Sequence, residues 1–348
     1  MTRRTHALSI PLALLVVLAL AACGEKSEPT GTETTTGTLE PFTLVLDYFP
    51  NADHAGIYAA QASGEYRKAG LDLKIQTPPD PAAPLKLLQA GRADMVISYE
   101  PELLLARDGG ASDLVSVGAL VQKPLTSIMS LGRRAIRSPE ALAGKRVGTA
   151  GLPYQSAYLK TILEKAGVDP ATVRETNVGF NLTPALISGR VDATLGAFWN
   201  YEGVDLERRR RDPTILRMER LGVPTYAELI FVGRTDRFDE RGASRVRRFL
   251  QATARGHRAL RDDPAGGTRG LLAANPDLDR GLQEAAVRAT LPVFFPADST
   301  LPFGYQSTDE WAAYGEWMRR NGLLKRPPNA ARALTNEFLP GQGLEPSG

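Results

Sequence analysis

The chain has 348 residues, 43% of them hydrophobic and 23% charged, which is enough for about two domains with a sizeable core. Its formal net charge of +3 is too small for a nucleic-acid binder that relies on phosphate attraction. Cys23 is the only cysteine, so an intrachain disulfide and a cysteine-rich metal cluster are excluded.

Residues 1–22 predict a lipoprotein signal peptide. Arg3 and Arg4 precede a nearly unbroken apolar run that is too short and wrongly flanked for a membrane span. The run ends in LAACG, which resembles a bacterial lipobox and implies cleavage before Cys23 and acylation of that cysteine. Two or three acyl chains would hold the protein on a membrane. Residues 23–41 are polar and rich in Thr, Gly and Glu, so we expect a disordered tether there.

Strand and helix patterns alternate from Phe42 onward. Short apolar runs alternate with helical segments, an order that predicts an α/β fold with parallel sheets covered by helices on both faces. The first expected elements are strands at 42–47, 71–75 and 93–98 and helices at 55–69, 84–90 and 100–106. The next are strands at 114–122, 127–131, 145–148, 172–178 and 191–196, a helix starting at Ser138, and helices at 154–165 and 183–188.

Two segments repeat the same pattern. LLQAGRADMVI (87–97) and ALISGRVDATL (185–195) each read helix, Gly, Arg, any residue, Asp and apolar strand. We expect Gly91 and Gly189 to end their helices with positive φ. The following Asp would open a strand in each copy. The two segments therefore predict equivalent corners of two similar lobes.

The last part of the chain is helical. After a strand-like run at 226–232, helical spacing covers 241–262, 268–274, 278–291 and 308–321. We expect this tail to pack on the first lobe, and the two passages near 125–131 and 226–232 to form a hinge. The predicted lobes are residues 42–126 plus 230–348, and residues 127–229.

Few residues offer covalent or metal chemistry. His6, His54 and His257 are the only histidines, and we expect His257 on a helix surface. No nucleophile-elbow, zinc-protease, dinucleotide-binding or phosphate-loop motif occurs. We therefore predict no catalytic residue, cofactor or metal ion.

Aromatic and amide residues gather directly after the predicted strands. In open α/β sheets ligands bind at the carboxyl ends of strands, so these residues would line a crevice. Their aromatic faces and polar groups suit a flat, polar heterocycle. A structural alternative stays open, since Asp47 and Asn51 would also fix a turn and Glu202 would also cap a helix. The residues are Tyr48, Phe49, Asn51, Tyr58, Tyr99, Glu100, Tyr154, Phe180, Asn181 and the segment 198–202.

The segment LDYFPNADHAGIYAAQASGEYRKAGLDLKI, which starts at Leu46, is similar to the opening of the thiamine-pyrimidine synthase-like (SsuA/ThiY-like) family. Its members often carry Pro-Asn-x-x-His-Ala-Gly-x-Tyr. Residues 178–207 and 222–232 look like later motifs of the family, and the helical tail resembles it in outline. The resemblance implies a type II periplasmic-binding-protein fold, with two α/β lobes joined by a two-crossover hinge.

The bacterial ThiY-type lipoproteins of this family deliver a thiamine-precursor pyrimidine to an ABC transporter. The resemblance thus implies an extracytoplasmic, lipid-anchored monomer that binds a small heterocycle and meets a permease, with no nucleic-acid partner. Its stacking residues would be Tyr58 and Trp199, while Asn51 and Glu202 would hydrogen-bond the ring and His54 would orient the loop. The full set of implied contacts is Asn51, His54, Tyr58 and Glu100 in the first lobe and Tyr154, Phe180, Trp199 and Glu202 in the second.

Other readings remain open at this point. Related bacterial branches bind riboflavin, sulfonates or nitrate. Eukaryotic relatives are synthases of a pyrimidine precursor that consume their own His, use iron and carry a cysteine-rich motif. This chain has no cysteine after Cys23, which argues against synthase activity. A sensor ectodomain is less well supported, since no second membrane segment is predicted after Phe42.

Overall fold

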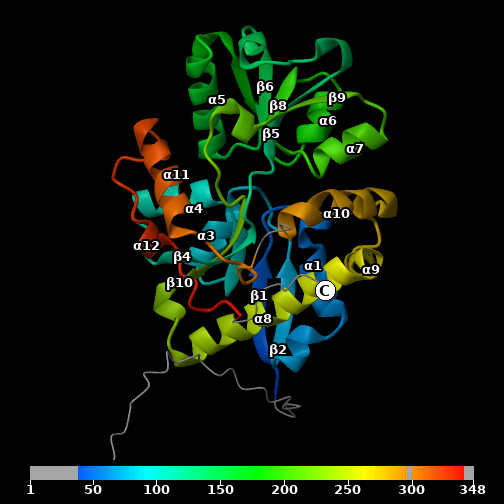
Figure 1. The fold of residues 1–348 in the computed structure, drawn as a ribbon, viewed down its shortest axis with the longest axis vertical. Helices are drawn as coiled ribbons and strands as arrows, with labels where there is room; N and C mark the ends of the chain where they lie inside the picture. Colours follow the sequence, from blue (N-terminus) through cyan, green and yellow to red (C-terminus); the bar gives the residue numbers. More distant parts are fainter. Residues whose placement is uncertain (1–37, 296–299, 341–348) are drawn as a thin grey trace, which may run out of the picture. The chain divides into compact units, whose positions relative to one another are not determined.

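The computed structural model describes residues 38–295 and 300–340 (Figure 1). The predicted signal peptide, Cys23 and nearly all of the predicted tether lie outside these residues. Within the described ranges, no helix combines the length and the apolar character needed to cross a bilayer.

The strands form two five-stranded sheets, which confirms the α/β fold (Figure 1). The sheets were predicted to be parallel, but both are mixed, since each contains antiparallel pairs beside the parallel ones. We call the sheets, with their covering helices, the first and second lobes. In the first, β10 (Leu229–Arg234) runs antiparallel to β3 (Met95–Ser98) and β4 (Leu114–Val121), while β1 (Glu40–Val45) is parallel to its neighbours. The first sheet has the order β2 (Leu71–Gln76), β1 (Glu40–Val45), β3 (Met95–Ser98), β10 (Leu229–Arg234), β4 (Leu114–Val121). The second has the order β7 (Arg174–Asn177), β6 (Arg146–Thr149), β8 (Ala193–Phe198), β5 (Thr126–Leu131), β9 (Pro213–Arg217).

Helices follow the strands in both lobes. Those of the first lobe are η1 (Ala52–His54), α1 (Ala55–Ala62), α2 (Glu65–Lys68), α3 (Ala83–Gln89) and α4 (Glu100–Asp108). Those of the second are η2 (Gly132–Arg134), η3 (Pro139–Leu142), α5 (Pro153–Lys165), η4 (Pro170–Thr172), α6 (Leu182–Ile187), α7 (Glu202–Arg208) and η5 (Met218–Leu221). The tail forms α8 (Glu240–Asp262), α9 (Pro264–Ala274), α10 (Arg280–Phe294), α11 (Thr308–Arg320) and α12 (Ala330–Ala333).

The two repeated segments do form equivalent corners. Gly91 and Gly189 have φ of 68° and 71°, as a helix end with a left-handed residue requires. Asp94 accepts a hydrogen bond from the backbone N–H of Thr43 in β1 (2.8 Å), and Asp192 accepts one from Arg146 in β6 (3.0 Å). Each Asp thereby ties the start of one parallel strand to the next. This pair of predictions is confirmed.

Several elements differ from their predicted form. The helix expected at 55–69 breaks at Gly64, whose φ of 74° ends α1 and starts α2. The helix expected from Ser138 is only the short 3-10 turn η3. The strand β9 was not predicted, because its five residues are all half-buried and lack clear alternation. His257, predicted on a surface, is fully buried against Gly56 of α1.

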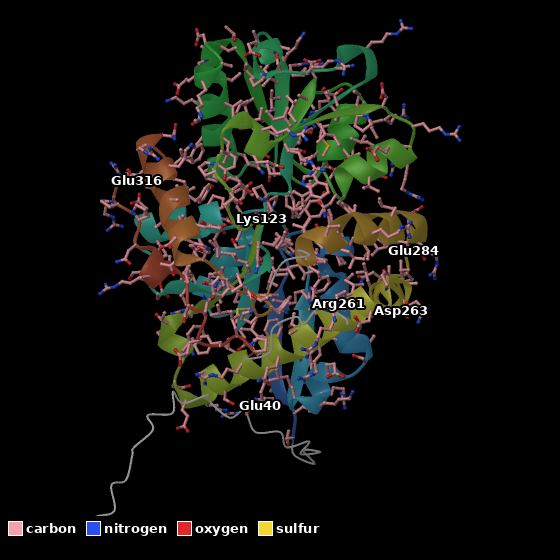
Figure 2. All side chains as sticks on the ribbon, in the orientation of Figure 1. Glu40, Lys123, Arg261, Asp263, Glu284 and Glu316 are labelled. Carbon is pink, nitrogen blue, oxygen red and sulfur yellow. The ribbon has the colours of Figure 1, made fainter. Side chains whose placement is uncertain are left out.

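A buried carboxylate holds the two crossovers of the hinge together. Glu228, directly before β10, accepts from the N–H groups of Leu125 (2.7 Å) and Thr126 (2.8 Å). It also accepts from the hydroxyls of Thr126 (2.9 Å) and Tyr226 (3.0 Å). Lys123, labelled in Figure 2, lies beside the first crossover and reaches Glu310 of α11 at 3.4 Å. Both passages of the chain are therefore fixed to one side chain.

Candidate functional site

The turn after β1 is built around Asn51. Its side-chain oxygen accepts from the N–H of Asp53 (2.8 Å), and its Nδ2 donates to the carbonyl of Phe49 (3.0 Å). The N–H of Asn51 donates in turn to Nδ1 of His54 (3.2 Å), which completes a capping box at the start of η1. Sequence reasoning left open whether Asn51 fixes the turn or binds a ligand; its two local bonds show that it fixes the turn.

His54 holds Asp47 in place. Because Nδ1 of His54 accepts a backbone N–H, its Nε2 carries the hydrogen and donates to Oδ1 of Asp47 (2.9 Å). The hydroxyl of Tyr99 donates to the other oxygen, Oδ2, at 2.9 Å. All three side chains are buried. Asp47 is thus an oriented acceptor at the end of β1, and His54 lies behind it.

A pocket lies where the carboxyl ends of the strands in the two lobes face each other. The space not filled by protein atoms amounts to about 450 Å³, open solvent included. Six of its fifteen lining residues are aromatic, and each lobe supplies one carboxylate, Asp47 and Glu202. Its lining is Asp47, Tyr48, Asn51, Pro81, Tyr99, Ala150, Leu152, Tyr154, Gln155, Phe180, Leu182, Gly196, Phe198, Tyr201 and Glu202.

Glu202 differs electrostatically from a surface glutamate. Burial raises its pKa to about 8, although the N–H of Phe198, which donates to Oε2 at 2.8 Å, acts in the opposite direction. The carboxyl group is therefore largely protonated at neutral pH in the ligand-free pocket. In that form it donates one hydrogen bond and accepts others, and in the ionised form it only accepts.

One glycine keeps this side of the pocket open. Gly196 in β8 has φ of 114°, a conformation that residues with a side chain rarely adopt. A Cβ atom at this position would lie 2.5 Å from Nε2 of Gln155. Oε1 of Gln155 in turn accepts from the N–H of Ala150 (2.8 Å). Gly196 therefore allows the backbone of β8 to approach the loop that follows β6.

The structure brings half of the predicted contact residues into the pocket. Asn51, Tyr154, Phe180 and Glu202 line it, and His54 supports it through Asp47. The three others, Tyr58, Glu100 and Trp199, lie elsewhere. Tyr58 is buried on α1, which packs against α8 and α9.

Glu100 and Trp199 each point away from the pocket toward the hinge. Glu100 accepts from the N–H of Ala227 (2.7 Å), and burial raises its pKa well above the usual range. The indole N–H of Trp199 donates to the carbonyl of Pro124 (3.1 Å), and the guanidinium of Arg217 lies 3.8 Å above the ring. Their chain neighbours Tyr99 and Phe198 line the pocket instead. The expected stacking by Tyr58 and Trp199 thus has no counterpart in the lining.

Two α/β lobes joined by two crossovers, with a pocket between the strand ends, define the periplasmic-binding-protein fold. Solved structures agree: the alkanesulfonate-binding protein SsuA of Xanthomonas axonopodis pv. citri bound to MOPS superposes with a TM-score of 0.64. It is 20% identical, and the match covers 86% of this chain and 99% of that one, so it shows the fold alone.

The sequence pattern of the NMT1/THI5-like family matches residues 51–266, and the chain belongs to this family. It is 31% identical to the formylaminopyrimidine-binding protein of Halalkalibacterium halodurans over 327 residues, which cover 93% of this chain and 96% of that protein. It is 26% identical to the 4-amino-5-hydroxymethyl-2-methylpyrimidine phosphate synthase of Legionella pneumophila, over 86% of this chain and 92% of the synthase.

Proposed function

We propose that this protein is the solute-binding lipoprotein of an ABC importer and captures a thiamine-precursor pyrimidine such as formylaminopyrimidine. The observation that carries the proposal is the pocket itself, with its aromatic walls and one carboxylate from each lobe. The similarity to a formylaminopyrimidine-binding protein over nearly the whole chain supports the choice of ligand.

The groups of the pocket match an aminopyrimidine. Such a ring offers an NH₂ donor beside a ring nitrogen acceptor, and its flat faces stack on aromatic side chains. Asp47, which already accepts from His54 and Tyr99, is the acceptor of the first lobe. Protonated Glu202 would donate to the ring nitrogen from the second lobe, and once ionised it would accept from the NH₂ group.

A thermal-shift screen tests the ligand class. The protein without its signal is heated with formylaminopyrimidine, hydroxymethylpyrimidine, thiamine, riboflavin and an alkanesulfonate. We expect an increase in Tm with formylaminopyrimidine and hydroxymethylpyrimidine alone, since a ligand that binds only the folded state stabilises it. Calorimetry then gives Kd. An increase with riboflavin or a sulfonate, and none with the pyrimidines, would replace the proposed ligand.

A second candidate function is synthesis of a pyrimidine precursor, which the similarity to the Legionella pneumophila synthase favours. His54 separates the two. In a binding protein its function is to orient Asp47, so His54→Gln weakens binding but produces no chemical change in the ligand. In a synthase that consumes its own histidine, the wild-type chain would show an altered His54 by mass spectrometry after incubation with iron. We expect an unaltered peptide.

The proposed membrane anchor and the monomeric state have their own tests. Cys23→Ala should move the protein from the membrane fraction to the soluble extracytoplasmic fraction of the producing bacterium.

Size-exclusion chromatography with light scattering should give the mass of a single chain. Co-purification with a permease in detergent, lost when the lipid anchor is removed by the same substitution, would support the importer.

A further inference from the structure

Helix α10 of the tail contacts both lobes. The expectation that the tail packs on the first lobe is therefore incomplete, since α10 lies against η1 of the first lobe and α7 of the second (Figure 1). Its contacts with the second lobe fall within a short stretch, residues 200–208, that directly follows the pocket strand β8. This stretch includes the pocket residues Tyr201 and Glu202.

The centre of the contact is a buried polar cluster. Nδ2 of Asn200 donates to Oδ1 of Asp53 (2.6 Å) and to Oγ1 of Thr290 in α10 (2.8 Å). All three side chains are almost completely inaccessible, with exposed fractions of 0% for Asn200 and Thr290 and 1% for Asp53. Oδ2 of Asp53 and Oδ1 of Asn200 have no hydrogen-bond partner among the described residues, so the cluster is only partly satisfied. Separation of the lobes would break the two bonds that Nδ2 of Asn200 donates, and these two bonds favour the arrangement seen here.

Two further contacts extend along the same face of α10. Nε2 of Gln283 donates to the hydroxyl of the pocket residue Tyr201 (3.1 Å). Near the start of the helix, Arg208 pairs with Asp279 at 3.3 Å. Positions 279, 283 and 290 are four and seven residues apart, a spacing that places them on one face of a helix. Their three partners all belong to the second lobe.

We propose that this face of α10, together with Asp53, is a latch that holds the lobes closed and sets how long a ligand stays bound. Asn200, Gln283 and Thr290 lie behind the pocket wall, and the lining formed by the described residues excludes them. They are positioning residues: the latch keeps Tyr201 and the segment around Glu202 against the ligand without touching it. The kinetic part of this inference rests on the proposed function; the closure itself does not.

The test uses isosteric removal of the two α10 contacts. Thr290→Val and Gln283→Met together delete the hydroxyl and the amide while keeping the helix surface filled. With formylaminopyrimidine as the probe, stopped-flow fluorescence should show a dissociation rate raised roughly tenfold, with the association rate within about twofold of wild type. Thr290→Ser keeps the hydroxyl, so its dissociation rate should lie much closer to that of wild type than to that of the double variant. Glu284→Ala is the matched control, since Glu284 pairs with Arg280 of the same helix at 3.6 Å. Figure 2 labels Glu284, which directly follows Gln283 and so lies on another face of α10.

Small-angle scattering of the ligand-free chain tests closure independently of any ligand. The double variant should have a larger radius of gyration than both wild type and Glu284→Ala, with Tm within a few degrees of theirs. Failure of the pyrimidine to bind would overturn the proposed function. The scattering comparison uses the ligand-free chain, so it would still test whether the α10 contacts hold the lobes closed. Equal dissociation rates, or equal scattering, in the double variant and the Glu284→Ala control would overturn the latch.

Discussion

The hydroxyl of Tyr48 in the first lobe donates a hydrogen bond of 2.9 Å to the backbone carbonyl of Phe180 in the second. The two rings meet edge to face with centroids 4.8 Å apart, and Phe49 packs on Phe180 at the same distance. Phe49 is 49% exposed, so this aromatic contact lies at the mouth of the pocket. The turn after β1 thus contacts the second lobe through three residues, Tyr48, Phe49 and Asp53.

Removing the ring of Phe180 should open this mouth. Phe180→Ala deletes a wall of the pocket and two aromatic contacts, each worth about 0.5–1.5 kcal/mol beyond the buried area. We expect Kd for formylaminopyrimidine to rise by about tenfold or more, measured by calorimetry. Trp199→Phe, which changes a ring outside the lining, should leave Kd within about threefold. A larger effect at Trp199 than at Phe180 would contradict this assignment of the pocket wall.

The comparison of these two aromatics shows what the sequence could and could not predict. The strands, their order along the chain and the gathering of aromatics after them follow from periodicity, and the pocket lies where these rules place it. The direction of a side chain just after a strand does not follow. After β3 and at the end of β8 neighbouring residues point to different sides: Tyr99 and Phe198 line the pocket, while Glu100 and Trp199 reach the hinge. After β1, in contrast, the neighbours Asp47 and Tyr48 both line it.

The contacts of the tail were equally inaccessible to pattern reasoning. Helical spacing shows which face of α10 is buried, but not which segment covers it. Thr290 and Gln283 are polar residues on a buried face. Their hydrogen-bond partners, Asn200 and Tyr201, lie about 80–90 residues earlier in the chain, so the sequence pattern does not reveal the pairing. Burial of His257 was missed for the same reason, because its partner Gly56 lies in α1.

Glu202 predicts a pH dependence of stability. Its pKa is about 8 in the folded state against 4.5 for an unperturbed glutamate, so the folded state binds more protons between these values. The contribution of Glu202 to the free energy of unfolding is therefore fully present below about pH 4.5 and is lost as the pH rises through 8. Glu202→Gln removes this dependence. We expect the ligand-free variant to melt at a higher temperature than wild type at pH 8.5, and the difference to shrink on acidification to pH 5.

Thermal melts from pH 5 to 9 check this, with Glu207→Gln as the control. Glu207 lies five residues further along on the same helix and is exposed. Its replacement should shift Tm little and by the same amount at every pH. A Glu202→Gln curve parallel to that of wild type would show that the buried carboxyl is ionised throughout this range.

Glu228 should matter more for stability than any contact of the pocket. Glu228→Leu leaves the N–H groups of Leu125 and Thr126 without their acceptor inside the hinge, which should lower the free energy of unfolding by about 3 kcal/mol or more. Glu228→Gln keeps one oxygen for these N–H groups, and its NH₂ can donate to Oγ1 of Thr126, so a loss of about 1 kcal/mol is expected. Urea denaturation at pH 8 gives both values. Equal losses would mean that the hinge N–H groups find other acceptors.

A close approach of two helices in the first lobe gives a prediction that is independent of any ligand. Helices α1 and α8 meet at Gly56 and Gly256, and a Cβ on Gly256 would collide with the carbonyl of Gly56 and lie 2.5 Å from Cβ of Ala60. A Cβ on Gly56 would lie 2.5 Å from the ring of His257. Neither helix has a flexible side chain at this point that could move aside, so the helices themselves would have to separate.

Gly256→Ala should therefore lower the free energy of unfolding by about 1–3 kcal/mol or more, although alanine is the better helix former. Gly64→Asn is the control, because Gly64 has no neighbour within 4 Å of a Cβ and asparagine tolerates its positive φ. Urea denaturation of the two variants beside wild type decides the matter. If Gly256→Ala proved as stable as the control, α1 and α8 would have to pack further apart than the contact of Gly56 with Gly256 allows. The buried imidazole of His257 would then lose the close neighbour that covers it. Burial lowers the pKa of this imidazole to about 4.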